Sequence, residues 1–364
     1  MKLKMIKQIR KHLLSEKIAR PFWHEKKTDR SLGKICLDKN ENNDENLKKI
    51  YKKIFNKSFS NSVSSYPNLH DCYNAIAKLN KVHIENILVG AGSDGIIRSV
   101  FETFVEKGNL ILKTSPTFQM YDVYSKIYQA KVINIEYVNK NNHISFDFNK
   151  FINVIKNNKI KLVCLPNPDS PTGTIISNNK MDLLLSETKK KNTIVLIDEA
   201  YFPFYSISAI KFLKKYSNLI ISRTFAKAWG LAGLRIGYGI ADKELIKYMN
   251  KVKSMYEVNT FAAHLIPHLL LKNKNVLNSV KSLNNSKKFF LKELNKMGFQ
   301  TLKSHGNFCH VNFGHKSNKI HNALNKKVLY KENFSENCLK DYSRFSLTNK
   351  KNFKKILSII SKIK

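Results

Sequence analysis

With 364 residues the chain is long enough for one large domain and a smaller one, and 42% of its residues are hydrophobic. Its net charge is +37, but only seven of its 64 cations are arginine and the lysines are spread along the whole chain, which indicates a compositional bias rather than a specific nucleic-acid partner. Five scattered cysteines without a C-x-x-C spacing, and the lack of any apolar stretch of about 18 residues, argue against a disulfide framework, a metal site and a membrane span, and indicate a cytoplasmic protein.

The first fifty residues are predicted to form an N-terminal arm and part of a smaller domain. Residues 1–14 are basic and amphipathic, but they lack the apolar core and the cleavage site of a signal peptide. A surface helix is therefore expected at the start of the chain.

Residues 51–250 are predicted to form the larger domain. Six apolar runs in it are expected to be strands, over residues 86–92, 109–116, 161–168, 193–200, 218–225 and 235–241. Most of them are unbroken rather than alternating, as expected of strands that are buried on both faces of a sheet. Amphipathic stretches at 93–107 and 179–191 are expected to be helices between them. This alternation predicts an α/β fold with a mostly parallel central sheet.

Residues 251–364 are predicted to form the C-terminal small domain. Helices are expected over 287–298 and 352–364, and short strands over 308–313 and 343–348. Together with residues 1–50 they would make a smaller α+β layer that is built from both ends of the chain.

Polar and aromatic residues follow the predicted strands at their carboxyl ends, where an open parallel sheet gathers its ligands. Gly92, Ser93 and Asp94 open a helix whose backbone amides can receive an anion. The next strand ends are followed by Phe118 and Tyr121, by the turn NPDSPTG (167–173), by Asp198 and Tyr201, and by Lys227. An amine, a carboxylate, an aromatic face and an amide cradle are what pyridoxal 5'-phosphate requires, because its aldehyde takes a lysine and its ring nitrogen takes an acid.

Residues 223–239, RTFAKAWGLAGLRIGYG, hold two of the seven arginines and four glycines. Where lysine is the usual cation, a retained arginine indicates a bidentate grip on a carboxylate or a phosphate. The segment is similar to the lysine motif of the fold type I, class I/II aminotransferases, roughly R-T-x-S-K-A-x-x-L-A-G-L-R-x-G-Y, and departs from it at one position. The chain most resembles the histidinol-phosphate aminotransferase group, from KNEN at residue 39 to SRFSLT at residue 348.

The resemblance implies a role in cofactor binding or catalysis for each matching residue. Lys227 would form the Schiff base and move the proton, Asp198 would pair with the pyridine nitrogen, and Tyr201 would hydrogen-bond the ring hydroxyl. The other implied cofactor contacts are Gly92, Ser93, Asp94, Thr224 and Arg235 around the phosphate, Phe118 on the ring face, Ser170 near the ring hydroxyl, and Tyr66 across a homodimer interface.

The resemblance also implies an amino donor, glutamate, and a phosphorylated oxo-acceptor, imidazole-acetol phosphate. Arg344 would bind the substrate carboxylate, or the phosphate that replaces it in histidinol phosphate. The expected substrate pocket further includes Lys331, Phe22 and Asn42.

Four positions depart from the family pattern. Ala226 replaces a serine, so that one phosphate hydroxyl is missing, for which Thr224 and Ser222 are the candidate replacements. Ser170 stands for an asparagine, Phe22 for a tyrosine and Lys331 for an arginine. The last two changes leave three interpretations open: a histidinol-phosphate enzyme with a drifted pocket, a paralogue that aminates another phosphorylated ketone such as dihydroxyacetone phosphate, or a phospho-amino-acid decarboxylase of the same fold.

Two functions of other classes fit the sequence less well. The run TIVLIDEA resembles a Walker B strand, but the chain has no G-x-x-x-x-G-K-[ST] loop to accompany it. A nucleic-acid-binding module would be expected to cluster its arginines with aromatic residues, whereas Arg235 and Arg344 belong to the predicted small-molecule site and Arg223 is expected to have a structural role.

Overall fold

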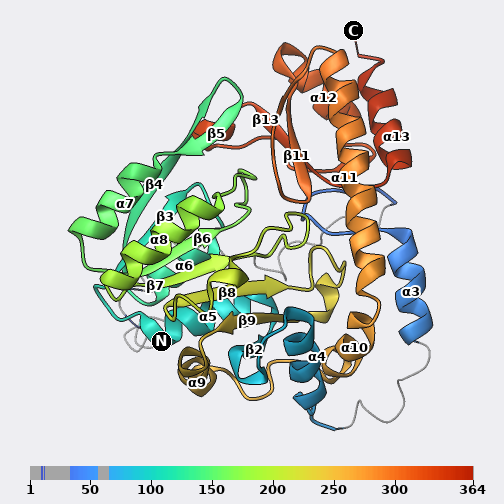
Figure 1. Ribbon diagram of the computed structural model, residues 1–364. Coiled ribbons are helices and arrows are strands. Elements are labelled where there is room, and N and C mark those ends of the chain that lie inside the picture. Colours follow the sequence, from blue (N-terminus) through green and yellow to red (C-terminus); the bar gives the residue numbers. More distant parts are fainter. Residues whose placement is uncertain (1–9, 11, 13–32, 56–64, 364) are drawn as a thin grey trace, which may run out of the picture.

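The computed structural model describes residues 10, 12, 33–55 and 65–363 of the chain (Figure 1). Most of the helix expected over residues 1–14, and the predicted substrate residue Phe22, lie outside the described residues. The division of the chain at residues 50 and 250 stays a prediction.

An eight-stranded sheet forms the centre of the larger part of the molecule, in the order β2-β9-β8-β7-β6-β3-β4-β5. Its strands are β2 (Ile87–Gly90), β3 (Leu110–Ser115), β4 (Lys131–Lys140), β5 (His143–Phe146), β6 (Ile160–Pro166), β7 (Ile194–Asp198), β8 (Leu219–Thr224) and β9 (Gly237–Ala241). Only β9 and the edge strand β5 run against the others. The structure thus confirms the α/β fold with a mostly parallel sheet.

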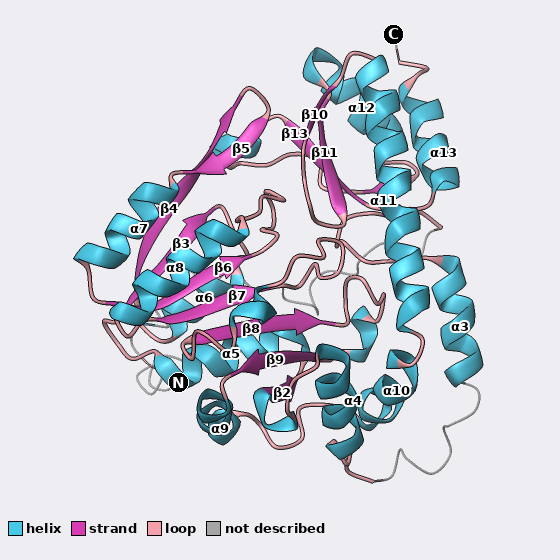
Figure 2. Cartoon of the chain, viewed as in Figure 1, coloured by secondary structure: helices cyan, strands magenta, loops and turns pink. Residues whose placement is uncertain are grey.

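Helices cover both faces of this sheet (Figure 2). One face packs against α7 (Phe148–Asn157) and α8 (Asn178–Lys190), and the other against α5 (Gly92–Phe104), α6 (Met120–Ile127) and α9 (Lys243–Val252). Successive residues of one strand face opposite sides, so that Val195 and Ile197 join the first core while Leu196 joins the second. The two-sided burial explains why these strands are apolar without interruption.

A smaller layer stands above the carboxyl ends of the central strands (Figure 1). Its sheet is β10 (Gln300–Leu302), β11 (Phe308–Asn312) and β13 (Tyr342–Ser346), and its helices are α11 (Asn273–Lys296), α12 (Ser317–Leu324) and α13 (Lys350–Ile360). The N-terminal strand β1 (Ile35–Cys36) pairs with β12 (Val328–Leu329), so residues from both ends of the chain build this layer.

Three further helices flank the central sheet on the side of β2. They are α3 (Glu45–Phe55), α4 (His70–Asn80) and α10 (Thr260–Leu270), and α10 packs against both of the others. Within the described part of the chain, none of the helices combines the length and the apolar character that crossing a bilayer requires.

Several elements of the fold were not foreseen, and for two of them the physical reason is clear. The β4–β5 hairpin lies at the sheet edge, where one face is partly exposed, so its strands lack the unbroken apolar runs that marked the others. Helix α11 begins at Asn273, fourteen residues before the predicted start, and its first half buries Val276, Val280 and Leu283 at helical spacing. Four of the five positions between these three are polar, which hides the helix from a search for long apolar runs.

Candidate active site

A cavity of about 500 Å³ lies between the carboxyl ends of the central strands and the smaller layer. The central sheet supplies one wall, and β13 with the segments around it supplies the opposite wall. Most of the predicted site residues line it, namely Ser93, Asp94, Phe118, Ser170, Asp198, Tyr201, Thr224, Lys227, Arg235, Lys331 and Arg344. Residues more than 250 positions apart in the sequence therefore meet in one site.

The N-terminus of α5 forms one end of the cavity and is built to receive an anion. The helix begins at Gly92, whose φ is +79°, and no side chain caps its first amides. A Cβ added at Gly92 would lie 3.1 Å from Nη2 of Arg235, so the guanidinium stands directly against the helix start. Uncapped amides and a guanidinium fork together match the oxygens of a phosphate group.

Strand β9 packs so closely against this helix start that a second residue of the motif, Gly237, has to be glycine. A Cβ at Gly237 would lie 2.5 Å from the carbonyl carbon of Gly92 and 2.6 Å from the amide nitrogen of Ser93. Contacts that short are not available to a side chain, so only glycine lets β9 pass here. The strand thereby holds the amides of the helix start in place.

Asp198 ends β7 as a buried carboxyl. Its Oδ1 accepts hydrogen bonds from Oγ of Ser222 (2.9 Å) and from the amide of Ala200 (3.1 Å), and its Oδ2 accepts one from the hydroxyl of Tyr121 (3.2 Å). Burial raises the pKa of the Asp198 carboxyl to about 6, and these three donors oppose the rise. A carboxyl fixed in this way can face a protonated heterocyclic nitrogen, whose charge would favour the ionised form.

The bond from Ser222 to Asp198 decides which hydroxyl can replace the one absent at Ala226. Ser222 is fully buried and its hydroxyl is committed to the carboxylate. Oγ1 of Thr224 accepts a hydrogen bond from the amide of Ala226 (3.1 Å) and lines the cavity, which leaves its hydrogen available as a donor. Thr224, and not Ser222, is therefore in position to contact an anion.

Lys227 enters the cavity from the segment after β8. Its Nζ donates a hydrogen bond to the carbonyl of Lys39 (2.8 Å) and lies 6.0 Å from the ring centre of Tyr201. The hydroxyl of Tyr201 accepts a hydrogen bond from Nδ2 of Asn40 (3.0 Å). The amine, the phenol and Asp198 thus share one cavity.

Two cations line the wall that the smaller layer contributes. Arg344 on β13 is half-buried, and burial lowers the pKa of its guanidinium. Its Nη2 donates to the carbonyl of Asp38 (3.3 Å), while its buried Nε has no hydrogen-bond partner within the described part of the chain. Lys331 is bound to Arg344 through main-chain hydrogen bonds of 3.1 and 2.8 Å, so the two side chains enter the cavity as neighbours. The pair can bind an acidic group of a substrate.

Besides Gly92 at the helix start, two predicted residues within the described part of the chain do not line this cavity. Asn42 is buried below it, where its Nδ2 donates to the carbonyl of Ala228 (2.8 Å) and to Oγ of Ser279 (3.2 Å). Its amide is therefore committed to holding the lysine segment, and Asn40 takes the position at the cavity that the KNEN motif had assigned to Asn42. Tyr66 lies away from the cavity on the surface, 77% exposed.

The structure adds residues that the sequence analysis did not assign. Asn40 has a φ of +53°, a conformation that asparagine tolerates better than most residues, which turns its amide toward Tyr201. Asp169 is fully buried in the NPDSPTG turn, where its Oδ2 accepts from Oγ1 of Thr117 (2.6 Å) and its Oδ1 from Oγ1 of Thr172 (2.7 Å). Thr117 lines the cavity. A charged residue between the prolines of a rigid turn is the signal that could have indicated Asp169.

Arg223, the other arginine of the motif, does not line the cavity. It is buried, and its Nε and Nη2 both donate to Oε2 of Glu199, at 2.9 and 2.8 Å. Its Nη1 donates to Oδ1 of Asn80 (2.6 Å) and its guanidinium lies 3.7 Å from the ring centre of Phe202. Arg223 therefore has a structural role next to Asp198.

Comparisons with known proteins agree with this geometry. The family described as aminotransferase class I and II matches residues 33–360. A histidinol-phosphate aminotransferase of Caldanaerobacter subterraneus subsp. tengcongensis is 35% identical over 83% of this chain and 85% of its own length. Among solved structures, histidinol-phosphate aminotransferase from Sinorhizobium meliloti in complex with pyridoxal-5'-phosphate superimposes with a TM-score of 0.79 at 18% identity, covering 97% of this chain and 96% of that one.

The same fold also carries a different chemistry. L-threonine-O-3-phosphate decarboxylase from Porphyromonas gingivalis gives a TM-score of 0.74 at 18% identity, covering 90% of this chain and 98% of that one. At this level of identity the likeness concerns the fold alone.

The residues of the cavity fit pyridoxal 5'-phosphate. An uncapped helix start beside Arg235 suits its phosphate, the buried acid Asp198 suits its ring nitrogen, and the amine of Lys227 lies in the same space. The family match covers residues 33–360, and a relative of which the chain covers 85% is 35% identical to it. The chain therefore belongs to the class I and II aminotransferases and is a transaminase that depends on pyridoxal 5'-phosphate.

Proposed function

We propose that this chain is a histidinol-phosphate aminotransferase, which moves an amino group between glutamate and imidazole-acetol phosphate. One observation carries the proposal: a single cavity holds an amine, a buried acid and a phosphate cradle at one wall, and two cations at the opposite wall. The names of relatives at 35 and 36% identity support the choice of substrate.

The proposed cofactor contacts come from backbone amides as well as from side chains. The amides of Ser93 and Asp94, with Arg235 and Thr224, would hold the phosphate group, and Asp198 would keep the ring nitrogen protonated. When bound, pyridoxal 5'-phosphate supplies an electrophilic aldehyde and a ring that withdraws electrons. Further contacts in this proposal are Tyr201 and Ser170 at the ring hydroxyl, Phe118 on the ring face and Gly92 at the helix start.

Lys227 would carry the proton transfers. Its Nζ is held by the carbonyl of Lys39, which orients the amine without a counter-ion. The amine would take the proton that leaves the α-carbon of the amino donor and return a proton to the acceptor in the second half of the reaction. A positioned acid–base group of this kind contributes roughly 10²–10⁴-fold to the rate.

Arg344 and Lys331 would select the substrate. The carboxylate of glutamate and the phosphate of imidazole-acetol phosphate can each occupy the same cationic wall in turn. Lys331 keeps the charge that an arginine would supply but lacks its bidentate fork, so phosphate recognition is expected to be weaker than with arginine.

The substrate is tested by steady-state rates with glutamate and two acceptors. Imidazole-acetol phosphate is expected to give the highest kcat/KM, with dihydroxyacetone phosphate far below it, and Lys227→Ala is expected to be inactive with both. Lys331→Arg should lower the KM for imidazole-acetol phosphate by about tenfold, because one charged hydrogen bond is worth about 1.5–3 kcal/mol. The half-reaction with glutamate alone, measured as the 2-oxoglutarate released per enzyme, checks that the donor half-reaction is intact in Lys331→Arg.

Two outcomes would contradict the proposed substrate. Equal inactivity toward histidinol phosphate and imidazole-acetol phosphate, with turnover of dihydroxyacetone phosphate, would identify a paralogue. Release of carbon dioxide from phosphoserine or phosphothreonine would identify a decarboxylase.

We also propose that two copies of the chain form a homodimer through the surface around Tyr66. The Tyr66 ring stacks on Tyr256 at 4.1 Å, and with Met255, which is 73% exposed, they form a cluster of exposed large apolar side chains. Such a cluster fits a protein partner better than water, and the resemblance places the residue corresponding to Tyr66 at a partner's cofactor.

Charge placed in this cluster tests the dimer. Tyr66→Glu with Tyr256→Glu should shift the sedimentation coefficient from that of a dimer to that of a monomer and weaken cofactor binding. Tyr248→Glu on α9, where the ring is also about half exposed, serves as the matched control and should leave both quantities unchanged. A double variant that keeps the dimer mass would contradict this interface.

The cysteines support a cytoplasmic location in this proposal. All five are unpaired thiols, and four of them are buried. Free thiols persist in a reducing compartment.

A further inference from the structure

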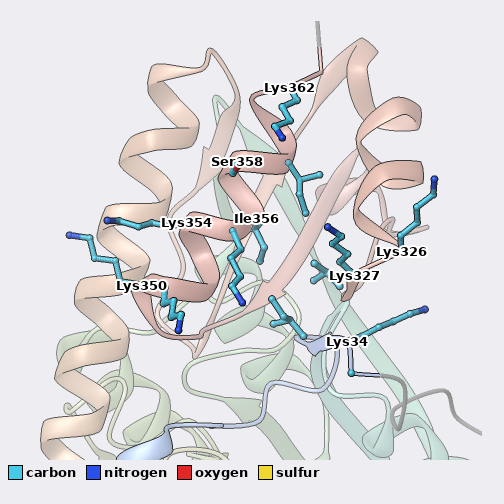
Figure 3. Close-up of a pocket in the computed structure, with 14 residues that line it drawn as sticks. Lys34, Lys326, Lys327, Lys350, Lys354, Ile356, Ser358 and Lys362 are labelled. Atoms are coloured by element: carbon cyan, nitrogen blue, oxygen red, sulfur yellow. The ribbon is translucent and has the colours of Figure 1, made fainter.

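A second hollow, which we call the lysine groove, lies in the smaller layer (Figure 3). It has a volume of about 960 Å³ and is formed by the segment before β1, the turn before β12 and helix α13. Eight of its fourteen lining residues are lysines, none is acidic, and the lysines are Lys34, Lys326, Lys327, Lys350, Lys351, Lys354, Lys355 and Lys362. Among the described residues, none lines both the groove and the active-site cavity.

The charge around this groove exceeds the lysine bias of the chain as a whole. Residues 251–364 carry 23 cations and five acidic residues, whereas the 250 residues before them carry 41 cations and 22 acidic residues. Nearly half of the net charge of +37 therefore lies in less than a third of the sequence. The even spread that the sequence analysis assumed holds for lysine itself but not for the acidic residues that would balance it.

The lysines of α13 occupy positions that weaken a helix in isolation. Lys350 and Lys351 lie in its first turn, where the helix dipole favours acidic residues, and α13 has no acidic residue there. Lys350 and Lys354, and likewise Lys351 and Lys355, are four residues apart, so like charges face each other along the helix. A bound anion would relieve both kinds of repulsion.

The shape and composition of the groove restrict the ligand. From Lys350 to Ile360 helix α13 rises about 15 Å, and Lys362 follows its end, so the lysines of this helix are spread over a length greater than that of a single phosphate. The lining contains neither arginine nor an aromatic ring, which removes bidentate recognition and base stacking as sources of affinity. The remaining source of affinity is the attraction between the lysine ammonium groups and a series of negative groups on the ligand.

Residues 1–32, which precede the groove-lining Gly33, are themselves basic and therefore do not match a groove lined by lysines. Residues 1–32 carry ten cations and three acidic residues, so charge does not draw them to the groove. An outside polyanion is the better match.

We propose that the lysine groove binds a chain of linked phosphates through charge alone. The phosphodiester backbone of a single-stranded nucleic acid and inorganic polyphosphate are two sources of this chemistry. Binding there is independent of the transamination reaction, because the groove and the cavity share no lining residue.

Fluorescence anisotropy of a labelled oligouridylate, with unlabelled polyphosphate and pyrophosphate as competitors, tests the proposal on the holoenzyme. The groove variant replaces Lys326, Lys327, Lys351, Lys355 and Lys362 by glutamine. The control variant replaces five exposed lysines of the larger layer in the same way, Lys107, Lys131, Lys156, Lys159 and Lys161. Both variants lose the same charge, so a difference between them reports position alone.

The groove variant is expected to bind oligouridylate at least tenfold more weakly than the wild type, and the control variant within about threefold of it. The slope of log affinity against log salt should fall by about three in the groove variant, since each phosphate contact to a single strand contributes about 0.7. Polyphosphate should compete with oligouridylate and pyrophosphate should not. Whichever of oligouridylate and polyphosphate binds more tightly identifies the source of the phosphate chain. Transaminase rates and thermal melting should be the same in all three proteins.

Equal weakening of the two variants would overturn the proposal, because the binding would then be diffuse attraction to a lysine-rich surface. Competition by pyrophosphate at the same concentration of phosphate groups as polyphosphate would also overturn it, since a chain would not be required. Binding of the wild type to vesicles of anionic lipid but to neither phosphate chain would assign the groove to a membrane surface instead.

Discussion

Burial shifts the pKa values of two carboxyl groups in and beside the cavity, and neither carboxyl forms an ion pair within the described part of the chain. Asp198 and Asp169 are both buried carboxyls whose pKa values burial raises to about 6, against the hydrogen bonds that they accept. For Asp198 the bound cofactor would supply a cationic partner. Asp169 faces Thr117 and Thr172 instead, and the charge of Lys113 favours its ionised form.

The raised pKa of Asp169 predicts how its contribution to stability depends on pH. Its carboxyl is protonated more readily in the folded state, so the stabilisation is complete below the unfolded pKa of 3.8 and is lost as the pH rises through about 6. At pH 7 the loss amounts to about 3 kcal/mol of unfolding free energy. Asp169→Asn should therefore stabilise the protein in urea at pH 7 and leave it nearly unchanged at pH 4.

The amide of that variant can keep the existing contacts, because its oxygen still accepts from Thr172 and its nitrogen can donate to Thr117. Equal unfolding free energies of the two proteins at pH 7 would show that the buried carboxyl carries no such penalty. A lower kcat with unchanged stability would instead assign Asp169 a role in placing Thr117 at the cavity.

At the scale of elements, the site depends on where strands end and how closely they pass the next helix. Strands β6, β7 and β8 are parallel neighbours, so their carboxyl ends bring Ser170, Asp198 and Lys227 to one edge. The antiparallel strand β9 returns past the start of α5, and its glycine at 237 lets the two backbones touch. The phosphate cradle is therefore a product of strand packing as much as of the helix itself.

Gly237→Ala should damage the cradle specifically. The new methyl group would meet backbone atoms of Gly92 and Ser93 at about 2.5 Å and push the helix start away from Arg235. Overpacking of this kind costs about 1–3 kcal/mol, which corresponds to a rise of roughly 10–100-fold in the dissociation constant of pyridoxal 5'-phosphate.

Gly233→Ala is the matched control from the same motif, since a Cβ there has no neighbour within 4 Å. Its dissociation constant, measured by titration of the apoprotein with the cofactor, should equal that of the wild type. Equal affinities in all three proteins would show that the cradle tolerates displacement of α5.

For the whole molecule, the cavity exists because two layers close on each other. The amide of His305 donates to the carbonyl of Gly173, at the end of the NPDSPTG turn, and Nδ2 of Asn307 donates to the carbonyl of Asn40. Lys287 on α11 secures that segment from the other side, with Nζ donating to the carbonyl of Ser304 (2.6 Å) and to its hydroxyl (2.9 Å). One buried lysine thus supports the contact between the layers.

Lys287→Met should loosen this contact. The lost hydrogen bonds are worth about 1–3 kcal/mol of unfolding free energy, since they leave buried carbonyl oxygens unpaired. Burial lowers the pKa of Lys287 to about 8, so its stabilising contribution is complete above its unfolded pKa of 10.5 and declines as the pH falls through 8. The difference between wild type and variant, measured by denaturant unfolding, should therefore be larger at pH 10 than at pH 7.

The neighbouring Lys288 is exposed and provides the control, because Lys288→Met removes the same charge without those hydrogen bonds. A similar change of the unfolding free energy in both variants would show that Lys287 contributes through its charge and not through its hydrogen bonds.

The sequence by itself determined the fold class and the cofactor chemistry. Strands that are buried on both faces of a sheet must be apolar throughout, which made six strands visible, and their order placed Asp198 and Lys227 at strand ends. The lysine motif is contiguous over residues 223–239, so its match to a family needed no knowledge of packing.

Only the tertiary structure decided which polar side chains face the cavity. Asn40 and Asn42 are two residues apart in one motif, and the backbone turn at Asn40 and the buried contacts of Asn42 separate their roles. The same holds for Ser222 and Thr224, and for a groove that joins Lys34 near the start of the chain to lysines after residue 325. Side-chain direction and the meeting of distant segments are set by packing, and packing is a property of the folded chain.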